Sequence, residues 1–542
     1  MKNMIKHSAF ALAAASLLGL ASCSKQIDDA HKNPNADVRV PVETLLPGII
    51  GNFVGSSSAQ GSAYGLANDG LYIGRYVQFW ATNTANNQYD RMGGATGGSD
   101  LLGSVWAMHY YGMGRNLTKM MEWAEEEKKW DYVGVGKAIR AWSWLTTTNT
   151  YGEAILKQAF NTDLLVFNYD TQEEMYIETR RLCHEAIWYL NRTGDGVSPA
   201  NLAKGDAYFY NGDVNKWKRF TYSVLARSFN HLTNKAIYNP DSVLFYSNLA
   251  INANEDNASA KFLASGLSGT FNFMGPFRSN AGALRQTRFM ANLMNGTNSL
   301  FAGVVDPRAP YLVRENTNGT YRGIRPNYGT DGLLAAEQPQ NYWGGAFGIT
   351  TAPGTDDGAR YIFRNAAPFP IITAAEIQFI KAEAHYRKGN MAAARQSYLD
   401  GINLSFDHLT STYQANIPTT LQITAAQKAA YLSNPVVAPP TITLSHIMLQ
   451  KYIAMYGWGL IETWNDLRRY HYTDLDPVTG QQVFRDFAPP TGIDLWPDNR
   501  GAWVYRCRPR FNSEFLYNIA ALDAVGGRAL DYHTKEQWFS QR

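Results

Sequence analysis

Cysteine is scarce in this sequence, whose 542 residues include three, at Cys23, Cys183 and Cys507. Three cysteines so far apart form neither a disulfide framework nor a C-x-x-C metal-binding pattern. The sequence leaves open whether Cys183 and Cys507 pair, although the helical pattern around Cys183 favours a buried free thiol. A chain of this length can bury a sizeable core without cross-links.

Charged residues are also sparse, at 18% of the chain against about 25% in an ordinary soluble domain. The 49 Lys and Arg residues nearly balance the 46 Asp and Glu residues, which leaves a net charge of +3. Because no basic field attracts phosphates, nucleic acid is excluded as a partner. Aromatic residues make up 13% of the chain. Most are expected to fill the core, but an aromatic, weakly charged surface suits neutral polar ligands such as sugars.

The chain lacks an apolar segment of the ~20 residues that a membrane-spanning helix needs. Its apolar stretch Ala9–Leu20 follows a basic start and runs into Leu20-Ala21-Ser22-Cys23. This is the pattern of a signal peptide, and its end resembles a bacterial lipobox, in which the cysteine is lipidated. We predict a signal peptide over residues 1–22 and lipidation of Cys23. The alternative is an ordinary secretory signal in which Cys23 has no role.

The rest of the chain divides by composition into a tether and one large domain. Residues 23–41 are polar and without periodicity, which predicts a tether, and residues 42–542 form the domain. Within the domain we predict a helical scaffold with loop-rich insertions, the scaffold at about 42–264 and 371–470 and the insertions at about 265–370 and 471–510. Loops this long are usually functional or disordered, and their aromatic residues argue against disorder because they would be costly to leave unpacked.

Apolar residues at a spacing of 3.6 predict several helices. The first predicted helix covers about Tyr132–Thr147, the second begins at Thr171 and the third begins near Asn215. The later predicted helices cover about Thr373–Gly389, Met391–Ile402, Leu444–Tyr456 and Ile461–Tyr470. Thr171 with Glu174, and Thr373 with Glu376, read as capping boxes. The spacing of Gly389, Ala394, Tyr398 and Gly401 resembles the second half of a tetratricopeptide repeat. We therefore predict a mostly α fold built from helix pairs.

Several short blocks follow one another along the chain: Asn149–Glu153, Asn211–Trp217, Ala375–Ile377, Ala382–Ala384, Gln450–Tyr452, Glu462–Trp464, Arg468-Arg469 and Arg508–Arg510, then Glu514 and Asn518. In this order they resemble the SusD and RagB family, the nutrient-binding outer-membrane lipoproteins of Bacteroidetes. Tyr151-Gly152-Glu153 departs from the family's commoner Gly-Asp-Val-Pro form. This departure points to a divergent branch and leaves the ligand class open.

The resemblance implies a SusD-like scaffold of tetratricopeptide-like helix pairs, with loop-rich regions forming the ligand-facing surface. It implies capture of oligosaccharides, or of peptides in some branches, and their delivery to a SusC-like TonB-dependent transporter. It also implies a lipid-anchored protein of the outer membrane that faces the cell exterior. Members of this family do not cleave their ligands, so no enzymatic activity is expected.

Catalytic signatures are missing from the sequence. Gly134–Ala138 lacks the spacer and the hydroxyl residue of a phosphate loop, and His184-Glu185 lacks the second His of a zinc site. No G-x-S-x-G elbow occurs. We predict no catalytic residue and no cofactor. An envelope glycoside hydrolase stays open as a less favoured alternative, because the separation of two carboxylates is a property of the folded protein.

Sugar binding needs flat apolar faces beside amide or guanidinium groups. Two segments supply both, and in the family that the chain resembles the ligand site draws on loops in these two regions. The predicted ligand-binding residues are Trp80, Asn83, Asn87, Tyr89, Arg91, Tyr328, Tyr342 and Trp343. We expect that replacing Trp80 or Trp343 by Ala weakens ligand binding without unfolding the protein.

One acidic turn resembles a calcium site. Asp474 and Asp476 are closely spaced carboxylates, which are typical ligands of calcium. The other positions of an EF-hand loop are missing, so a plain hairpin turn is favoured and calcium at Asp474 and Asp476 is the alternative.

Overall fold

The computed structural model describes residues 39–55, 65–95, 98–265, 270–275, 278, 283–343 and 356–542. The signal peptide, Cys23 and the tether up to residue 38 lie outside this range, so their prediction stays open. One compact unit spans Val42–Arg542, and it contains every element described below. In the described residues, no helix has both the length and the apolarity to cross a membrane.

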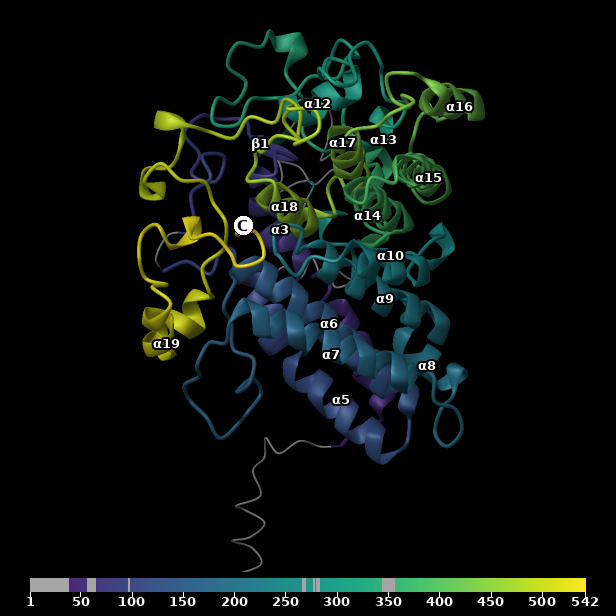
Figure 1. Ribbon diagram of the computed structural model, residues 1–542, viewed down its shortest axis with the longest axis vertical. Coiled ribbons are helices and arrows are strands. Elements are labelled where there is room, and N and C mark those ends of the chain that lie inside the picture. Colours follow the sequence, from purple (N-terminus) through teal and green to yellow (C-terminus); the bar gives the residue numbers. More distant parts are fainter. Residues whose placement is uncertain are drawn as a thin grey trace, which may run out of the picture. The chain divides into compact units, whose positions relative to one another are not determined.

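Helices dominate this unit (Figure 1), as the sequence predicts. They are α2 (Leu46–Gly51), α3 (Leu66–Tyr76), α4 (Ser104–Ala107), α5 (Arg115–Glu126), α6 (Trp130–Tyr151), α7 (Gln172–Leu190), α8 (Pro199–Asp206), α9 (Val214–Asn230), α10 (Pro240–Leu249), α12 (Arg288–Asn295), α13 (Ala309–Leu312), α14 (Ala374–Arg387), α15 (Met391–Thr412), α16 (Ala425–Ser433), α17 (Leu444–Ala454), α18 (Leu460–Arg469) and α19 (Ile519–Ala524). Two short π-helical turns, η2 (Met108–Gly114) and η12 (Phe511–Phe515), precede α5 and α19.

Helices α6 and α7 form the first large pair and lie side by side in Figure 1. Helix α6 ends at Gly152, whose φ of 85° suits glycine. Helix α7 begins with both halves of the predicted capping box, since the Thr171 side chain accepts from Glu174 N and the Glu174 carboxylate accepts from Thr171 N at 2.9 Å. The predicted start of this helix is confirmed.

Helices α14 and α15 form the second large pair. Gly389 separates them with a φ of 78°, a left-handed conformation that favours glycine. At Gly401 a Cβ atom would lie 2.9 Å from the ring of Phe379, so the small residue lets the two helices approach. The predicted helix–turn–helix unit is confirmed.

The capping box predicted at the start of α14 is only half formed. Thr373 accepts a bond from Glu376 N at 3.3 Å, but the Glu376 carboxylate accepts from Arg227 Nε at 2.6 Å and from Arg227 Nη2 at 2.7 Å. Both charged side chains are buried. A bidentate charge-assisted pair is stronger than a bond to a backbone amide, and it ties α9 to α14.

Two small antiparallel sheets join segments that are far apart in the sequence. Strand β1 (Trp80–Thr82) pairs with β3 (Leu284–Gln286) in the register Trp80 to Gln286, and β2 (Ala258–Ala260) pairs with β4 (Phe369–Ile372). Strands of three or four residues are too short to show a period of two, and the sequence did not predict them. Strand β1 leads directly into residues 83–91, where four of the predicted ligand-binding residues lie.

The remaining cysteines, Cys183 and Cys507, are free and buried. Burial raises the pKa of both thiols, so both stay protonated at neutral pH. They pack as small apolar side chains in the core.

Candidate ligand-binding site

Three loops meet at the end of strand β1: residues 83–91, 325–331 and 486–496, here called the three-loop site. Asn86 N donates to Asn327 Oδ1 at 3.1 Å, which joins the first loop to the second. Gly329 lies so close to Asn83 that a Cβ atom there would collide with the Asn83 carbonyl. The two sequence segments predicted to bind ligand are therefore neighbours in the fold.

Asp494 joins the second loop to the third. Its Oδ1 accepts from Asn327 Nδ2 at 3.0 Å and its Oδ2 accepts from Tyr328 OH at 2.7 Å. The guanidinium of Arg325 stacks on the ring of Tyr328 at 3.6 Å and lies 3.5 Å from Asp494 Oδ2. The hydrogen bond to Asp494 raises the pKa of Tyr328 above its usual value, so the phenol stays protonated as a donor.

Arg91 fastens the first loop to the third. Its Nη2 donates to the carbonyl of Ile493 at 2.6 Å and to that of Leu495 at 2.9 Å, and its Nε donates to the carbonyl of Asp494 at 3.3 Å. Its guanidinium also lies 5.4 Å from the ring of Trp496. Arg91 therefore acts as an organiser of the three-loop site, because its donors are used inside the protein.

A polar pocket of about 240 Å³ opens at the three-loop site. Its polar and charged lining residues are Gln78, Arg288, Asn292, Arg325, Tyr328, Asp486, Thr491 and Asp494, and its apolar walls include Phe289, Pro326, Pro489 and Pro490. Helix α12 contributes Arg288, Phe289 and Asn292 from its first two turns. Flat apolar walls beside hydrogen-bonding groups are what a site for a polar ligand requires.

Of the residues predicted from the sequence, Tyr328 alone lines this pocket. Asn83 and Arg91 belong to its loops, and Asn87 is half-buried and accepts a bond from Arg75 Nη1 at 2.7 Å. Direct ligand contact by these residues stays a prediction.

The other predicted residues are buried: Trp80 is 1% exposed, Tyr342 1%, Trp343 5% and Tyr89 8%. The Tyr342 ring stacks on Phe363 with centroids 4.7 Å apart, and its hydroxyl lies 2.5 Å from that of Tyr456. Rings this deeply buried offer no face on which a sugar can stack, so in this structure they support the three-loop site through packing. Because Trp80 is buried, we now expect Trp80→Ala to destabilise the fold.

The sequence did not single out the third loop or helix α12. Asp486 and Asp494 lie in the segment read as loop-rich, with the pair Pro489-Pro490 between them, and Arg288 and Asn292 lie in the other such segment. The only available signal was their place in these long loops, since nothing in the sequence pairs residue 494 with residue 328.

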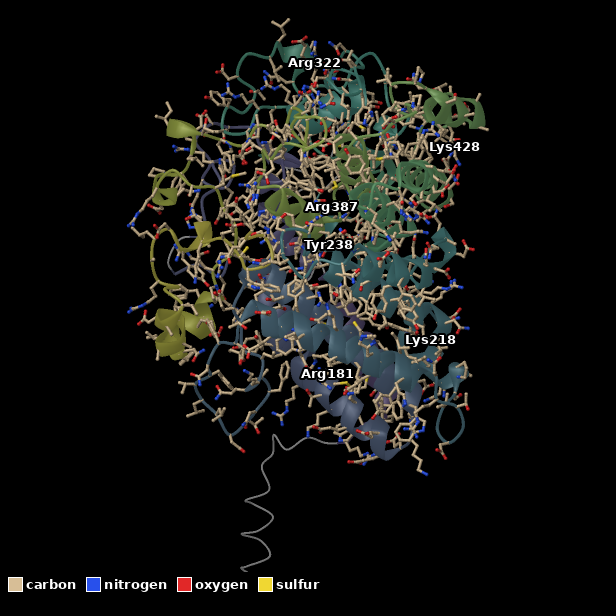
Figure 2. All side chains as sticks on the ribbon, in the orientation of Figure 1. Arg181, Lys218, Tyr238, Arg322, Arg387 and Lys428 are labelled. Atoms are coloured by element: carbon tan, nitrogen blue, oxygen red, sulfur yellow. The ribbon has the colours of Figure 1, made fainter. Side chains whose placement is uncertain are left out.

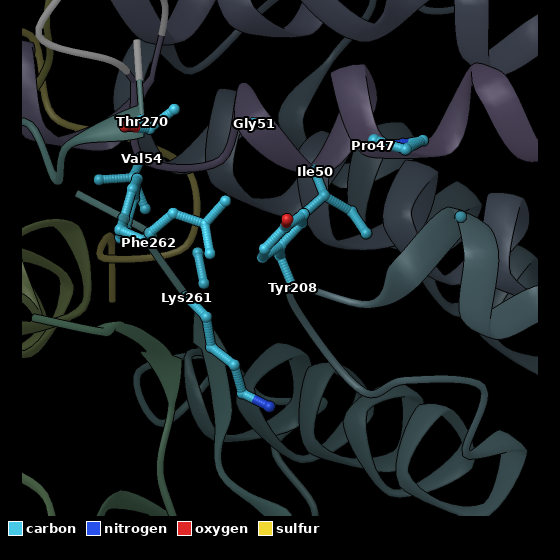
Figure 3. Close-up of a pocket in the computed structure, with 11 residues that line it drawn as sticks. Pro47, Ile50, Gly51, Val54, Tyr208, Lys261, Phe262 and Thr270 are labelled. Carbon is cyan, nitrogen blue, oxygen red and sulfur yellow. The ribbon is translucent and has the colours of Figure 1, made fainter. Parts of the chain in front are cut away.

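A second pocket of about 290 Å³ lies between α2, the segment around residues 205–208, residues 260–263 and Thr270 (Figure 3). Its walls are mostly apolar, with Pro47, Ile50, Val54 and Phe262 among them. Hydroxyl-rich ligands need hydrogen-bond partners that such walls do not supply, so the three-loop pocket is the better candidate for a polar ligand.

The acidic turn is a hairpin turn in which the carboxylates of Asp474 and Asp476 both bind other groups of the protein. Asp476 is buried and accepts from Tyr386 OH and from Val478 N, each at 3.0 Å. Asp474 pairs with His471 at 2.7 Å and with Arg542 at 2.9 Å. Because the two carboxylates serve different partners, the calcium alternative is not supported. In the part of the chain that the structure describes, no three His, Cys, Asp or Glu side chains gather into a metal site.

His471 makes the stability of this region depend on pH. Hydrogen bonds to Asp474 and Glu536 raise its pKa from 6.5 to about 9. A raised pKa means that the folded state favours the charged imidazole, so its stabilisation is complete below pH ~6.5 and is lost as the pH rises through about 9. We expect the difference in free energy of unfolding between the wild type and His471→Asn to shrink over this range. Asn tolerates the φ of 41° found at His471.

Urea unfolding of both proteins at pH 6, 7.5 and 9.5 measures this difference. A difference that stays constant with pH would show that His471 stabilises the turn by packing and not by its charge.

The comparisons with known proteins agree with this architecture. The model of a SusD-like family, described as "Starch-binding associating with outer membrane", matches residues 54–490. No curated protein matches the chain.

Solved structures with the same fold include a SusD/RagB family protein from Bacteroides thetaiotaomicron, at 18% identity and a TM-score of 0.65 over 93% of this chain and 99% of the other. A SusD homolog from Bacteroides uniformis has 18% identity and a TM-score of 0.65 over 92% and 99% of the two chains. A chitin-binding SusD homolog from Flavobacterium johnsoniae has 18% identity and a TM-score of 0.64 over 92% and 98%. The resemblance noted in the sequence is thus confirmed, and because the family model covers most of the compact unit, this chain belongs to the SusD-like family.

Proposed function

We propose that this protein captures oligosaccharides at the cell surface and delivers them to a SusC-like TonB-dependent transporter of the outer membrane. The observation that carries the proposal is the polar three-loop pocket on a helical scaffold, in a chain of the SusD-like family. The family's description as starch-binding and the chitin-binding homolog of the same fold support a glycan ligand.

The pocket suits one end of an oligosaccharide. Its volume of about 240 Å³ is below the roughly 300–1,000 Å³ of a site for a drug-sized ligand, so the remainder of a chain would lie outside it. The Tyr328 ring and the Pro489-Pro490 wall offer apolar faces for the C–H side of a sugar ring. Asn292 and the guanidinium groups supply partners for hydroxyls.

The carboxylates of the pocket support binding without cleavage. Glycoside hydrolysis needs one protonated carboxyl group and a second carboxylate acting on the same bond. Asp494 accepts bonds from Asn327 and Tyr328, and Asp486 accepts bonds from Ser299. Both carboxylates thus hold the loops of the site together through hydrogen bonds at both oxygens, which supports a structural role for them.

The membrane attachment belongs to the same proposal. A lipid on Cys23 would hold the domain at the outer membrane, facing the cell exterior, because several acyl chains suffice for stable anchoring. Protease treatment of intact cells tests the orientation, and full protection of the protein would place it inside.

Tyr328→Ala is expected to weaken oligosaccharide binding about tenfold or more, because it removes the aromatic wall and releases Asp494 and Arg325. Isothermal titration with a panel of oligosaccharides measures the loss. Tyr208→Ala, at a 44% exposed tyrosine of the apolar pocket, is the matched control and should bind as the wild type does. Binding of peptides and of no saccharide would favour the peptide-binding alternative, and release of shortened products would favour the hydrolase.

A further inference from the structure

The three-loop pocket is lined by four charged side chains: Arg288, Arg325, Asp486 and Asp494. Their formal charges cancel, which by itself would suggest a site for a neutral ligand. The partners that each group already has inside the protein decide which hydrogen-bonding atoms remain free for a ligand.

Both acidic side chains already accept hydrogen bonds inside the protein. Asp486 accepts from Ser299 N at 2.6 Å through Oδ2 and from Ser299 Oγ at 2.7 Å through Oδ1. Asp494 accepts at both oxygens from the second loop, and Arg325 lies 3.5 Å from it. The oxygens of both carboxylates therefore already accept hydrogen bonds from the protein, and Arg325 is paired with Asp494, while the neutral Ser299 leaves the charge of Asp486 in place.

Arg288 is the fourth charge, and its guanidinium is exposed. Among the described residues, no acceptor or carboxylate is within bonding distance of its side chain. Its backbone is nevertheless held firmly, since Arg288 N donates to the carbonyl of Ile324 at 2.7 Å and Thr287 caps helix α12 by accepting from Met290 N. Among the described lining residues, the pocket therefore has one guanidinium whose donors are free for a ligand, on a well-supported element.

We propose that the three-loop pocket takes an anionic saccharide, and that Arg288 binds its carboxylate or sulfate group. An arginine forms paired, charge-assisted hydrogen bonds with either group, whereas a neutral glycan would leave the guanidinium without a charged partner. The inference rests on the proposed function and gives it a substrate class. Asn292 on the next turn of α12 is placed to bind a neighbouring hydroxyl.

Pairs of ligands that differ only in charge separate the contribution of the charge to the affinity from that of the sugar. Uronate oligosaccharides of several linkages, each as the free acid and as the methyl ester, are titrated into the detergent-solubilised full-length protein, together with sulfated and unmodified neutral oligosaccharides. We expect at least one acid or sulfate ester to bind about tenfold tighter than its uncharged counterpart. Raising the salt concentration should weaken the charged ligand selectively, because salt screens exposed charges.

Arg288→Gln should bring the ratio of charged to uncharged affinity close to one, and Arg288→Lys should restore part of it. Arg322→Gln is the control, since Arg322 (Figure 2) is 50% exposed, lies 3.6 Å from Glu337 and does not line the pocket. Its ratio should match the wild type.

Equal affinity for charged and uncharged ligands in the wild type would overturn the inference and leave the proposed function standing. The same holds if Arg288→Gln keeps the preference. Failure of every saccharide to bind would overturn the proposed function and this inference together.

Discussion

Replacing Glu383 by Gln is expected to lower the free energy of unfolding by about 3–5 kcal/mol, because it removes one partner of a buried ion pair. The Glu383 carboxylate is fully buried and accepts from Arg469 Nη1 at 2.8 Å and from Arg469 Nη2 at 2.9 Å. Tyr470 OH at 2.6 Å and Asn230 Nδ2 at 3.1 Å donate to it as well. This single carboxylate ties together α9, α14 and α18.

The cost arises from Arg469, which is 1% exposed. Arg469 also pairs with Asp466 at 2.6 Å, and Arg387, which Figure 2 labels next to Tyr238, lies 3.2 Å from Glu383. Without the Glu383 charge, two guanidinium groups share less negative charge at a site that water does not reach. Burial by itself would raise the pKa of Glu383. The charge of Arg469 outweighs this effect and holds the pKa well below its usual value.

Urea unfolding measures the effect as a shift in midpoint at an unchanged slope. Glu185→Gln is the matched control, because Glu185 pairs with Lys137 at 2.7 Å and with Arg181 while its side chain is 36% exposed. An exposed pair of this kind contributes about 0–1 kcal/mol. Equal midpoints for the two variants would contradict the assignment of Glu383 as a structural centre.

Trp80→Ala is expected to lower the free energy of unfolding by about 3–5 kcal/mol, the usual cost of truncating a buried tryptophan. The Trp80 ring is 1% exposed, its Nε1 donates to the carbonyl of Leu71 at 3.0 Å, and it packs edge-on against Tyr342 at 6.1 Å. Gly74 approaches the ring so closely that a Cβ atom there would collide with it. The loss of ligand binding in this variant should follow from damage to strand β1.

Thermal and urea unfolding of Trp80→Ala and Trp80→Phe separate packing from ligand contact. Phe should recover part of the stability, because it fills most of the cavity, and binding should recover with it. Trp188→Ala is the control, since Trp188 is 57% exposed on α7 and its loss should change stability by about 0.5 kcal/mol or less. Normal stability of Trp80→Ala with weakened binding would return Trp80 to the ligand site.

Local features of the fold could be predicted because their physical causes are local. The capping box at Thr171 and Glu174, the glycine stop at Gly389 and the helical spacing of apolar residues in α6 and α14 involve residues within a few positions of one another. One local prediction was only half right: the Glu376 side chain does not bond the backbone of Thr373 but accepts from Arg227, which lies 149 positions away in the sequence. A charged group that is remote in sequence but adjacent in the fold binds the carboxylate more strongly than the local backbone amide does.

By itself the sequence determined the mostly α class, the main helix pairs, the family and the two segments near the site. Only the tertiary structure decided which side chains line the candidate pocket, because the fold turns Trp80 and Tyr342 into the core while Tyr328 stays at the pocket. It also brought Asp494 to Tyr328, across 166 positions, and left Arg288 without a partner in the described residues. Burial and pairing at a site depend on contacts between distant segments, and residue spacing along a chain does not contain them.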